Sequence, residues 1–147
     1  MKGFRIRDYE PGDFEPVLKL WQVTGMGNTE RGDDKDTVES CIKTGGKLLI
    51  LEDEQNNMIA GTSWMTFDGR RLYLHHFGIL PEYQGKGLSK YLLEETLEYV
   101  KKSGHQVKLE VHSSNTVAIN LYEKYGFKYL GDYKVFIIRK MDDIKRK

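Results

Sequence analysis

A glycine-rich turn between an apolar segment and a long amphipathic segment is the feature that most restricts the fold of this chain. The turn is Gln84-Gly85-Lys86-Gly87, and the apolar segment before it ends at Pro81. Glycines let the backbone approach a ligand closely, and the free N–H groups and dipole of a first helical turn attract an anion such as a pyrophosphate. Lys86 adds a positive charge at the same place. The sequence therefore predicts a phosphate-binding turn, with a simple tight turn as the alternative.

Two better-known phosphate loops do not fit this stretch. A Walker loop requires a glycine five residues before Gly85, where Leu80 stands, and a Ser or Thr after the lysine, where Gly87 stands. A dinucleotide-binding fingerprint requires a third glycine where this chain has Lys90, and a parallel βαβ unit around it. The turn therefore predicts a different kind of phosphate-binding protein.

Length and charge limit the class of protein further. The chain has 147 residues, close to the usual size of one domain, so we expect a single domain over residues 1–147. Its formal net charge is +1, and Lys and Arg are interspersed with Asp and Glu. Nucleic-acid binding requires a basic stripe along the phosphate backbone, so we expect no nucleic-acid partner.

Cysteine content and hydropathy point to the cytoplasm. The single cysteine, Cys41, cannot form an intramolecular disulfide, and we expect no metal site. No apolar run approaches the roughly 18–20 residues that span a bilayer, and the first residues lack the apolar region of a signal peptide. We therefore expect a cytoplasmic protein without a membrane segment.

Apolar periodicity and turn residues predict a mixed α/β fold with an antiparallel meander in the middle. Asn56-Asn57 and Asp68-Gly69 are the expected hairpin turns, and Asp13 is the expected N-cap of the first helix. Strands are predicted at residues 4–9, 47–51, 59–67, 72–80, 107–111 and 133–139, and helices at residues 14–21, 37–43, 85–103 and 115–125.

A second motif follows the turn, one helix and one strand later. It consists of Asn115, Ala118, Leu121-Tyr122 and Gly126-Phe127. With this motif and the turn in order, the chain resembles the GCN5-related N-acetyltransferase (GNAT) superfamily. The family's first pattern, Gln or Arg, two residues, Gly, one residue, then Gly or Ala, matches Gln84, Gly87 and Ser89, with serine as a small departure. The order of elements agrees over essentially the whole chain.

The resemblance implies a GNAT-type fold, in which a mostly antiparallel mixed sheet is flanked by about four helices. Splayed strands would form a slot for acetyl-CoA, the expected cosubstrate. The implied activity is transfer of an acetyl group to a primary amine by direct attack on the thioester. The alternative is a non-catalytic acyl-CoA-binding regulatory module on the same fold.

The resemblance also implies which residues hold the cosubstrate. Backbone amides of the turn would bind the pyrophosphate, and the strand before it would pair with the pantetheine arm, helped by a bulge near Gly78. The amide of Phe77 or Ile79 would stabilise the oxyanion, although both side chains also suit core packing. Asn115 suits either a pantetheine contact or an N-cap. The full set is Phe77, Gly78, Ile79, Gln84, Gly85, Lys86, Gly87, Leu88, Ser89, Asn115 and Tyr122.

The catalytic candidates also follow from the resemblance. Tyr122 is the expected general acid near the thioester sulfur, and the alternative is a buried helix residue. Glu110 is the first candidate for the general base, because N-terminal acetyltransferases of the family use a glutamate at this spacing. His75 and Tyr73 share a strand face and come next, followed by His76, which alternation directs to the other face unless a bulge resets the register. Surface histidines or a water-relayed base are the alternatives.

The sequence leaves the acceptor open. The resemblance implies that residues 25–36 and the hairpin loops set acceptor choice. Acidic residues in the first segment favour a cationic amine or simply form a solvated surface, whereas Arg70 and Arg71 favour an acidic group. The acidic residues are Glu30, Asp33, Asp34 and Asp36. A small amine, an amino acid and a protein N-terminus all remain candidates, as do a monomer and a homodimer.

Overall fold

The computed structural model describes residues 1–27 and 29–147, so Asn28 of the expected acceptor segment lies outside the described residues. The chain divides into two compact units, Met1–Glu110 and Val111–Lys147. The first unit contains a five-stranded sheet with strand order β1-β2-β3-β4-β5. Its strands are β1 (Phe4–Asp8), β2 (Lys47–Asp53), β3 (Met58–Phe67), β4 (Arg71–Ile79) and β5 (Gln106–Leu109). The first four are antiparallel neighbours and β5 runs parallel to β4, which confirms the predicted mixed, mostly antiparallel sheet.

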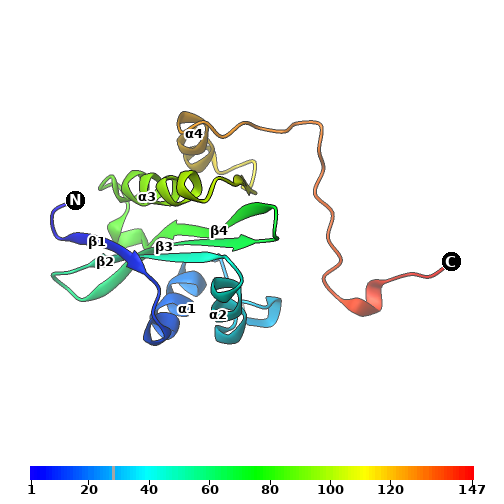
Figure 1. Ribbon diagram of the computed structural model, residues 1–147, viewed down its shortest axis with the longest axis horizontal. Helices are drawn as coiled ribbons and strands as arrows, with labels where there is room; N and C mark the ends of the chain where they lie inside the picture. The colour runs from blue at the N-terminus through cyan, green and yellow to red at the C-terminus, as the bar shows by residue number, and fades with distance from the viewer. Residues whose placement is uncertain (28) are drawn as a thin grey trace. The chain divides into compact units, whose positions relative to one another are not determined.

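Helices cover both faces of this sheet. Helices α1 (Phe14–Val23) and α2 (Lys35–Lys43) lie on one face, and α3 (Leu88–Ser103) lies on the other (Figure 1). Helices α1 and α3 bury residues spaced mostly three or four apart, because that spacing places side chains on one face of a helix. The buried residues are Phe14, Val17, Leu20 and Trp21 of α1 and Leu88, Leu92, Leu93 and Thr96 of α3.

The second unit contains one α-helix, α4 (Thr116–Lys124), and a short 3-10 helix at Met141–Asp143, among the residues described. The Ala118 amide donates to Asn115 Oδ1 at 3.2 Å, so the N-cap role expected for Asn115 is present. Gly126, with φ of +96°, follows the end of the helix, where a left-handed conformation suits glycine.

The strand predicted at residues 133–139 is wrong. Within residues 111–147, all of which the structure describes, no strand forms, and apolar side chains are exposed, for example Phe136 at 89%. The segment is rich in β-branched and aromatic residues. Such composition favours an extended backbone only where a neighbouring strand accepts its hydrogen bonds, and no such ladder pairs with this segment in the described chain.

The ends of two helices and one strand differ from the predicted ends. Helix α3 begins at Leu88 rather than residue 85, because Gly85 and Gly87 adopt left-handed φ angles of +75° and +76°. Helix α2 begins earlier than predicted, because Asp34 Oδ1 accepts the Thr37 amide at 2.8 Å. Strand β5 ends at Leu109, two residues before the predicted end.

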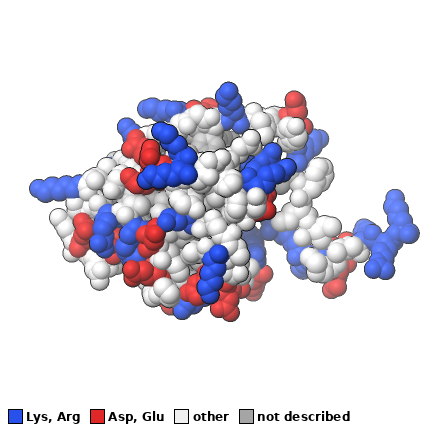
Figure 2. Space-filling view, in the orientation of Figure 1, with Lys and Arg blue, Asp and Glu red and all other residues white. Residues whose placement is uncertain are grey.

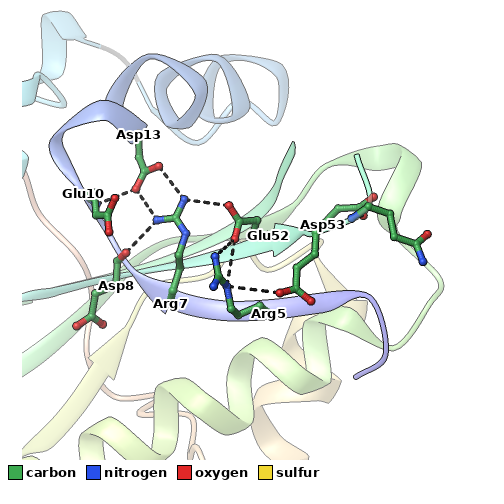
Figure 3. Close-up of polar contacts among 9 residues, drawn as sticks. Arg5, Arg7, Asp8, Glu10, Asp13, Glu52 and Asp53 are labelled. Carbon is green, nitrogen blue, oxygen red and sulfur yellow. Dashed lines mark hydrogen bonds and ion pairs between the residues drawn. The ribbon is translucent and has the colours of Figure 1, made fainter. Parts of the chain in front are cut away.

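Asp13 stands at the predicted N-cap position of α1, but its side chain makes no capping hydrogen bond to that helix and belongs to an ion-pair network instead (Figure 3). Arg7 of β1 donates from both terminal nitrogens to Asp13, at 2.7 and 2.9 Å, and one of them also donates to Glu52 of β2 at 3.3 Å. The Glu10 amide donates to the same Asp13 carboxylate at 2.7 Å, and Arg5 donates to Glu52 at 2.6 Å. The network thus joins β1, β2 and the turn before α1.

The network lowers the pKa of two carboxyl groups, those of Asp13 and Glu52. Burial alone would raise the pKa of Asp13, but the Arg7 guanidinium and the Glu10 amide outweigh it and hold that pKa below its ordinary value. Hydrogen bonds from Arg5 and then Arg7 lower the pKa of Glu52. The ionised forms of these carboxyls therefore stabilise the fold.

Lys and Arg are interspersed with Asp and Glu on the face drawn in Figure 2. A search of residues 1–27 and 29–147 finds no helix with the length and apolar character needed to cross a membrane.

We predict that Arg7→Gln lowers the free energy of unfolding by about 1–2 kcal/mol, between the values for exposed and buried ion pairs. The pKa of both carboxyls is lower in the folded state, so the contribution is complete above about pH 5 and is lost as the pH falls through the lowered values. Urea unfolding from pH 3 to pH 7 measures this. The loss in Arg7→Gln should shrink toward pH 3.

The control is Lys90→Gln, which removes an exposed pair with Glu94 at 3.8 Å. It should leave the pH profile of stability unchanged. An Arg7→Gln loss that is as large at pH 3 as at pH 7 would contradict the ion-pair explanation.

Candidate active site

Strands β4 and β5 stay paired over only part of β4. The parallel ladder runs from Arg71 opposite Gln106 to Leu74 opposite Leu109, where β5 ends. Strand β4 continues to Ile79, and residues 75–79 have β3 on one side and no strand of the first unit on the other. An extended ligand could add as a further strand along this part of β4.

A β-bulge lies at the point where the two strands part. Thr62 is opposite Gly78 and Trp64 is opposite His75, so one β3 residue faces two β4 residues, His76 and Phe77. His76 has φ of +41°, which is uncommon for a residue other than glycine. The bulge was predicted near Gly78 and is found immediately before it.

A chain of buried hydrogen bonds holds the backbone of the bulge. The Trp21 indole N–H of α1 donates to Thr62 Oγ1 at 2.9 Å, and the Thr62 hydroxyl donates to the His76 carbonyl at 2.9 Å. Trp21 and Thr62 are both fully buried. The hydrogen bonds therefore connect α1, β3 and β4 at the bulge.

The His76 side chain is held separately. Its Nε2 lies 2.9 Å from Asp33 Oδ1, and its ring packs edge-on against Trp21 and Trp64, at centroid distances of 4.6 and 5.2 Å. The His75 ring also lies near Trp64, at 5.8 Å. Simple alternation would have separated the two histidines, so the bulge has reset the register as the alternative prediction required.

Past the bulge, side chains fix the glycine-rich turn to the end of the sheet. Gln84 Nε2 donates to the Ile79 carbonyl at 3.0 Å, and the Tyr83 hydroxyl donates to Asp53 Oδ2 of β2 at 2.9 Å. Tyr83 is buried, and Lys86 Nζ lies 5.0 Å from its ring centroid. The predicted cation therefore lies in the turn, above an aromatic ring.

The turn has the geometry of an anion site. Left-handed Gly85 and Gly87 turn the backbone into the first turn of α3, which contains Leu88 and Ser89 and whose amides have no helical acceptor. A Cβ atom at Gly87 would meet only the end of the Met1 side chain, at 3.7 Å, so the backbone is open to close approach. A phosphate group fits this turn.

Three of the predicted catalytic residues come together at the other end of the open edge. The Tyr73 and His75 rings stack at a centroid distance of 4.2 Å, and His75 Nε2 lies 2.9 Å from Thr66 Oγ1. Burial, followed by hydrogen bonding to Glu110, raises the pKa of Tyr73. Lys108 Nζ lies 5.7 Å from the Tyr73 ring centroid. Glu110, Tyr73 and His75 therefore form one cluster.

The histidine of this cluster is a weak base. Burial, with a smaller contribution from His76, lowers the pKa of His75 to about 4, so its ring is neutral at pH 7. Tyr73 remains protonated and can donate a hydrogen bond.

Asn115 and Tyr122 belong to the second unit, on α4 and its N-cap. Tyr122 is buried, and its ring lies 5.5 Å from the Phe127 ring. Burial raises the pKa of Tyr122 to about 12, so the hydroxyl keeps its proton at neutral pH. A protonated phenol is the form that a general acid needs.

The sequence reasoning did not identify the residues that support the bulge and the cluster. These are Trp21, Thr62, Trp64, Thr66 and Lys108. One signal was present, because Thr62 and Ser63 are polar residues within a strand that is otherwise largely apolar, and both are fully buried. Buried hydroxyls need partners, so they mark places where another element contacts the strand. Among the described residues, no group of three His, Cys, Asp or Glu side chains could hold a metal ion.

A strand that continues past its neighbour and leads into a glycine-rich turn is suited to an extended, phosphate-bearing ligand. The model of the acetyltransferase (GNAT) family matches residues 14–127, and the chain belongs to this family. The predicted family and enzyme class, an acetyltransferase, are therefore confirmed.

Solved structures give the same fold. An acetyltransferase from Streptococcus agalactiae is 19% identical with a TM-score of 0.76, over 96% of this chain and 94% of that one. The Escherichia coli ribosomal-protein-S18-alanine N-acetyltransferase is 26% identical with a TM-score of 0.71, over 85% and 77% of the two chains. A GNAT acetyltransferase from Elizabethkingia anophelis, with acetyl-CoA bound, is 20% identical with a TM-score of 0.65, over 87% and 78%.

We predict that Thr62→Val lowers the free energy of unfolding by about 1–3 kcal/mol, because it leaves the buried Trp21 indole N–H without its acceptor. Urea unfolding measures the loss. The comparison variant is Thr44→Val, which removes hydrogen bonds from an exposed hydroxyl to α2 carbonyls. Equal effects of the two substitutions would show that the buried hydrogen bonds do not stabilise the bulge.

Proposed function

We propose that this protein is an acetyl-CoA-dependent N-acetyltransferase that acetylates a primary amine by direct attack on the thioester. The observation that carries the proposal is the open edge of β4. It runs from the cluster of Tyr73, His75 and Glu110 directly into the glycine-rich turn. Because the family match covers residues 14–127, across the boundary between the two units, we propose that both units form one acetyltransferase domain.

In this proposal the turn and β4 hold the cosubstrate, and acetyl-CoA supplies the acetyl group as a thioester. Backbone amides from Gln84 to Ser89 bind the pyrophosphate, since left-handed glycines and a helix N-terminus favour an anion. The free edge of β4 pairs with the pantetheine arm, and Asn115 contributes a further contact. The amide of Phe77 or Ile79 donates to the oxyanion that develops on the carbonyl oxygen.

Transfer forms one N–C bond and breaks the thioester C–S bond. Glu110 accepts a proton from the attacking amine, because an ammonium with a pKa of about 10.4 has no free lone pair. Tyr122 donates a proton to the departing thiolate. Tyr73 positions the Glu110 carboxylate, and neutral His75 serves as a second acceptor. The products are an amide and a free thiol, with no oxidant or reductant required.

The other candidate is a non-catalytic acyl-CoA-binding module. The clustering of Tyr73, His75 and Glu110 beside the open edge favours catalysis, because a binding module needs no such groups. The two functions differ in one observable. A module would bind acetyl-CoA and release no thiol with any amine, whereas an enzyme turns over with at least one.

We predict that Gly87→Val abolishes acetyl-CoA binding measured by isothermal titration calorimetry, because a side chain at the turn blocks close approach of the pyrophosphate. Gly104→Val is a matched control at the other end of α3. Gly104 has a similar φ of +70°, and a Cβ there meets nothing within 4 Å. Both variants should lose similar stability, about 1–2 kcal/mol, and only Gly87→Val should lose binding. Equal affinity in the two variants would place the pyrophosphate elsewhere.

We predict that Glu110→Gln lowers kcat about 10²- to 10⁴-fold at pH 7, the usual contribution of a general base. Acetyl-CoA affinity should be unchanged. Thiol release with a panel of amines measures kcat, and the deficit should shrink as the pH approaches the pKa of the amine. Glu98→Gln, an exposed α3 substitution, is the control. A Glu110→Gln enzyme with full activity at pH 7 would exclude Glu110 as the base.

A further inference from the structure

A basic cleft lies beside the cluster of Tyr73, His75 and Glu110. It occupies about 270 Å³ at the β3–β4 hairpin, and Tyr73 and His75 form part of its wall. Its charged wall residues are Arg70, Arg71, Lys108 and Asp68. The cleft therefore has three cationic side chains and one anionic side chain next to the proposed base.

The acidic residue of the cleft, Asp68, accepts hydrogen bonds within the hairpin turn. Asp68 Oδ1 accepts the Arg70 and Arg71 amides at 2.8 and 2.7 Å, and these hydrogen bonds lower the pKa of Asp68. Its carboxylate thus binds backbone rather than guanidinium groups. Within residues 1–27 and 29–147, no ion pair involves the side chain of Arg70, Arg71 or Lys108. The cationic groups of the cleft are available to a ligand.

Two carboxylates of the acidic segment between α1 and α2 are held by other parts of the chain. Asp33 is paired with His76 at 2.9 Å, and Asp34 caps α2. These two carboxylates therefore have structural partners. The sequence left acidic and basic residues as conflicting indications of the acceptor, and the structure favours the basic ones.

We propose that the acceptor is a small amine that also carries a carboxylate or phosphate group, which Arg70, Arg71 and Lys108 bind in this cleft. The proposal rests on the function proposed above and narrows its substrate class. Arginine binds both anions through paired N–H groups, and a lysine adds a point charge. A volume of about 270 Å³ is below the range of most drug-sized ligand sites, so a small acceptor fits. The amino group of the bound acceptor then reaches Glu110 on the side of the cleft that Tyr73 lines.

Matched pairs of amines test the proposal. The phosphate pair is 2-aminoethyl phosphate and ethanolamine, and the carboxylate pair is β-alanine and its amide. Thiol release with saturating acetyl-CoA gives kcat/KM for each amine. The wild type should prefer one or both anionic members about tenfold or more, as expected for charge-assisted hydrogen bonds, and the pair with the larger preference identifies the anion.

Substitutions of the cationic residues test whether the cleft causes the preference for anionic amines. Arg70→Gln, Arg71→Gln and Lys108→Gln should each reduce the ratio of anionic to neutral kcat/KM about fivefold or more, mainly through KM. Lys101→Gln, an exposed cation at the end of α3, should leave the ratio unchanged. Because Asp68 binds only backbone amides of the hairpin, the substitutions keep the turn. Equal ratios in the wild type and the three variants would overturn the proposal.

A separate arm distinguishes failure of this proposal from failure of the proposed function. Turnover of neutral and anionic amines at equal rates would overturn the anion site and leave the acetyltransferase intact. If no amine releases thiol although acetyl-CoA binds, the proposed function fails. The cleft is then tested by titrating 2-aminoethyl phosphate and β-alanine into the acetyl-CoA-loaded protein. Heat in the wild type that is lost in the Arg70→Gln/Arg71→Gln double variant supports the cleft, and no heat in the wild type overturns it.

Discussion

The hydrogen bonds from Trp21 to Thr62 and from Thr62 to His76 are the interaction on which the site depends. His76 adopts a backbone conformation that costs a non-glycine residue about 1–3 kcal/mol, and such a conformation persists only where its surroundings impose it. The surroundings here are a buried indole, a buried hydroxyl and an aspartate 2.9 Å from the imidazole. They fix the bulge where β5 ends, so β4 passes beyond its parallel partner with a free edge.

Contacts with other parts of the fold also fix the backbone at the other end of β4, where the glycine-rich turn begins. The turn owes its shape to glycines, but its position is set by Gln84, which binds the last carbonyl of β4, and by Tyr83, which binds Asp53 of β2. Both contacts are made by side chains and use none of the backbone amides of the turn. The amides of the turn can therefore be in place before a phosphate arrives, and a preorganised site loses less entropy on binding.

Local patterns account for what the sequence could predict. Periodicity and turn residues located β1 to β5 and α1 to α4, because these signals depend on neighbours in the chain. The details of the bulge depend on Trp21, which lies 41 residues before Thr62, and no local pattern contains that contact. The ion-pair role of Asp13 was missed for the same reason, since its carboxylate accepts from Arg7, a residue of another element. The segment at residues 133–139 has strand composition without a partner. The proposed roles of the site residues remain predictions.

Charge balance at the cluster explains why an anionic acceptor and a carboxylate base can share one site. The His75 ring is neutral at pH 7, because burial lowers its pKa to about 4, and Tyr73 stays protonated. Neither contributes a charge beside Glu110. The cations line the same cleft as Tyr73, so in the proposal they neutralise the anionic group of an acceptor while its amine approaches the carboxylate. Without those cations, an anionic acceptor would meet Glu110 as a like charge, and like charges at close range disfavour binding.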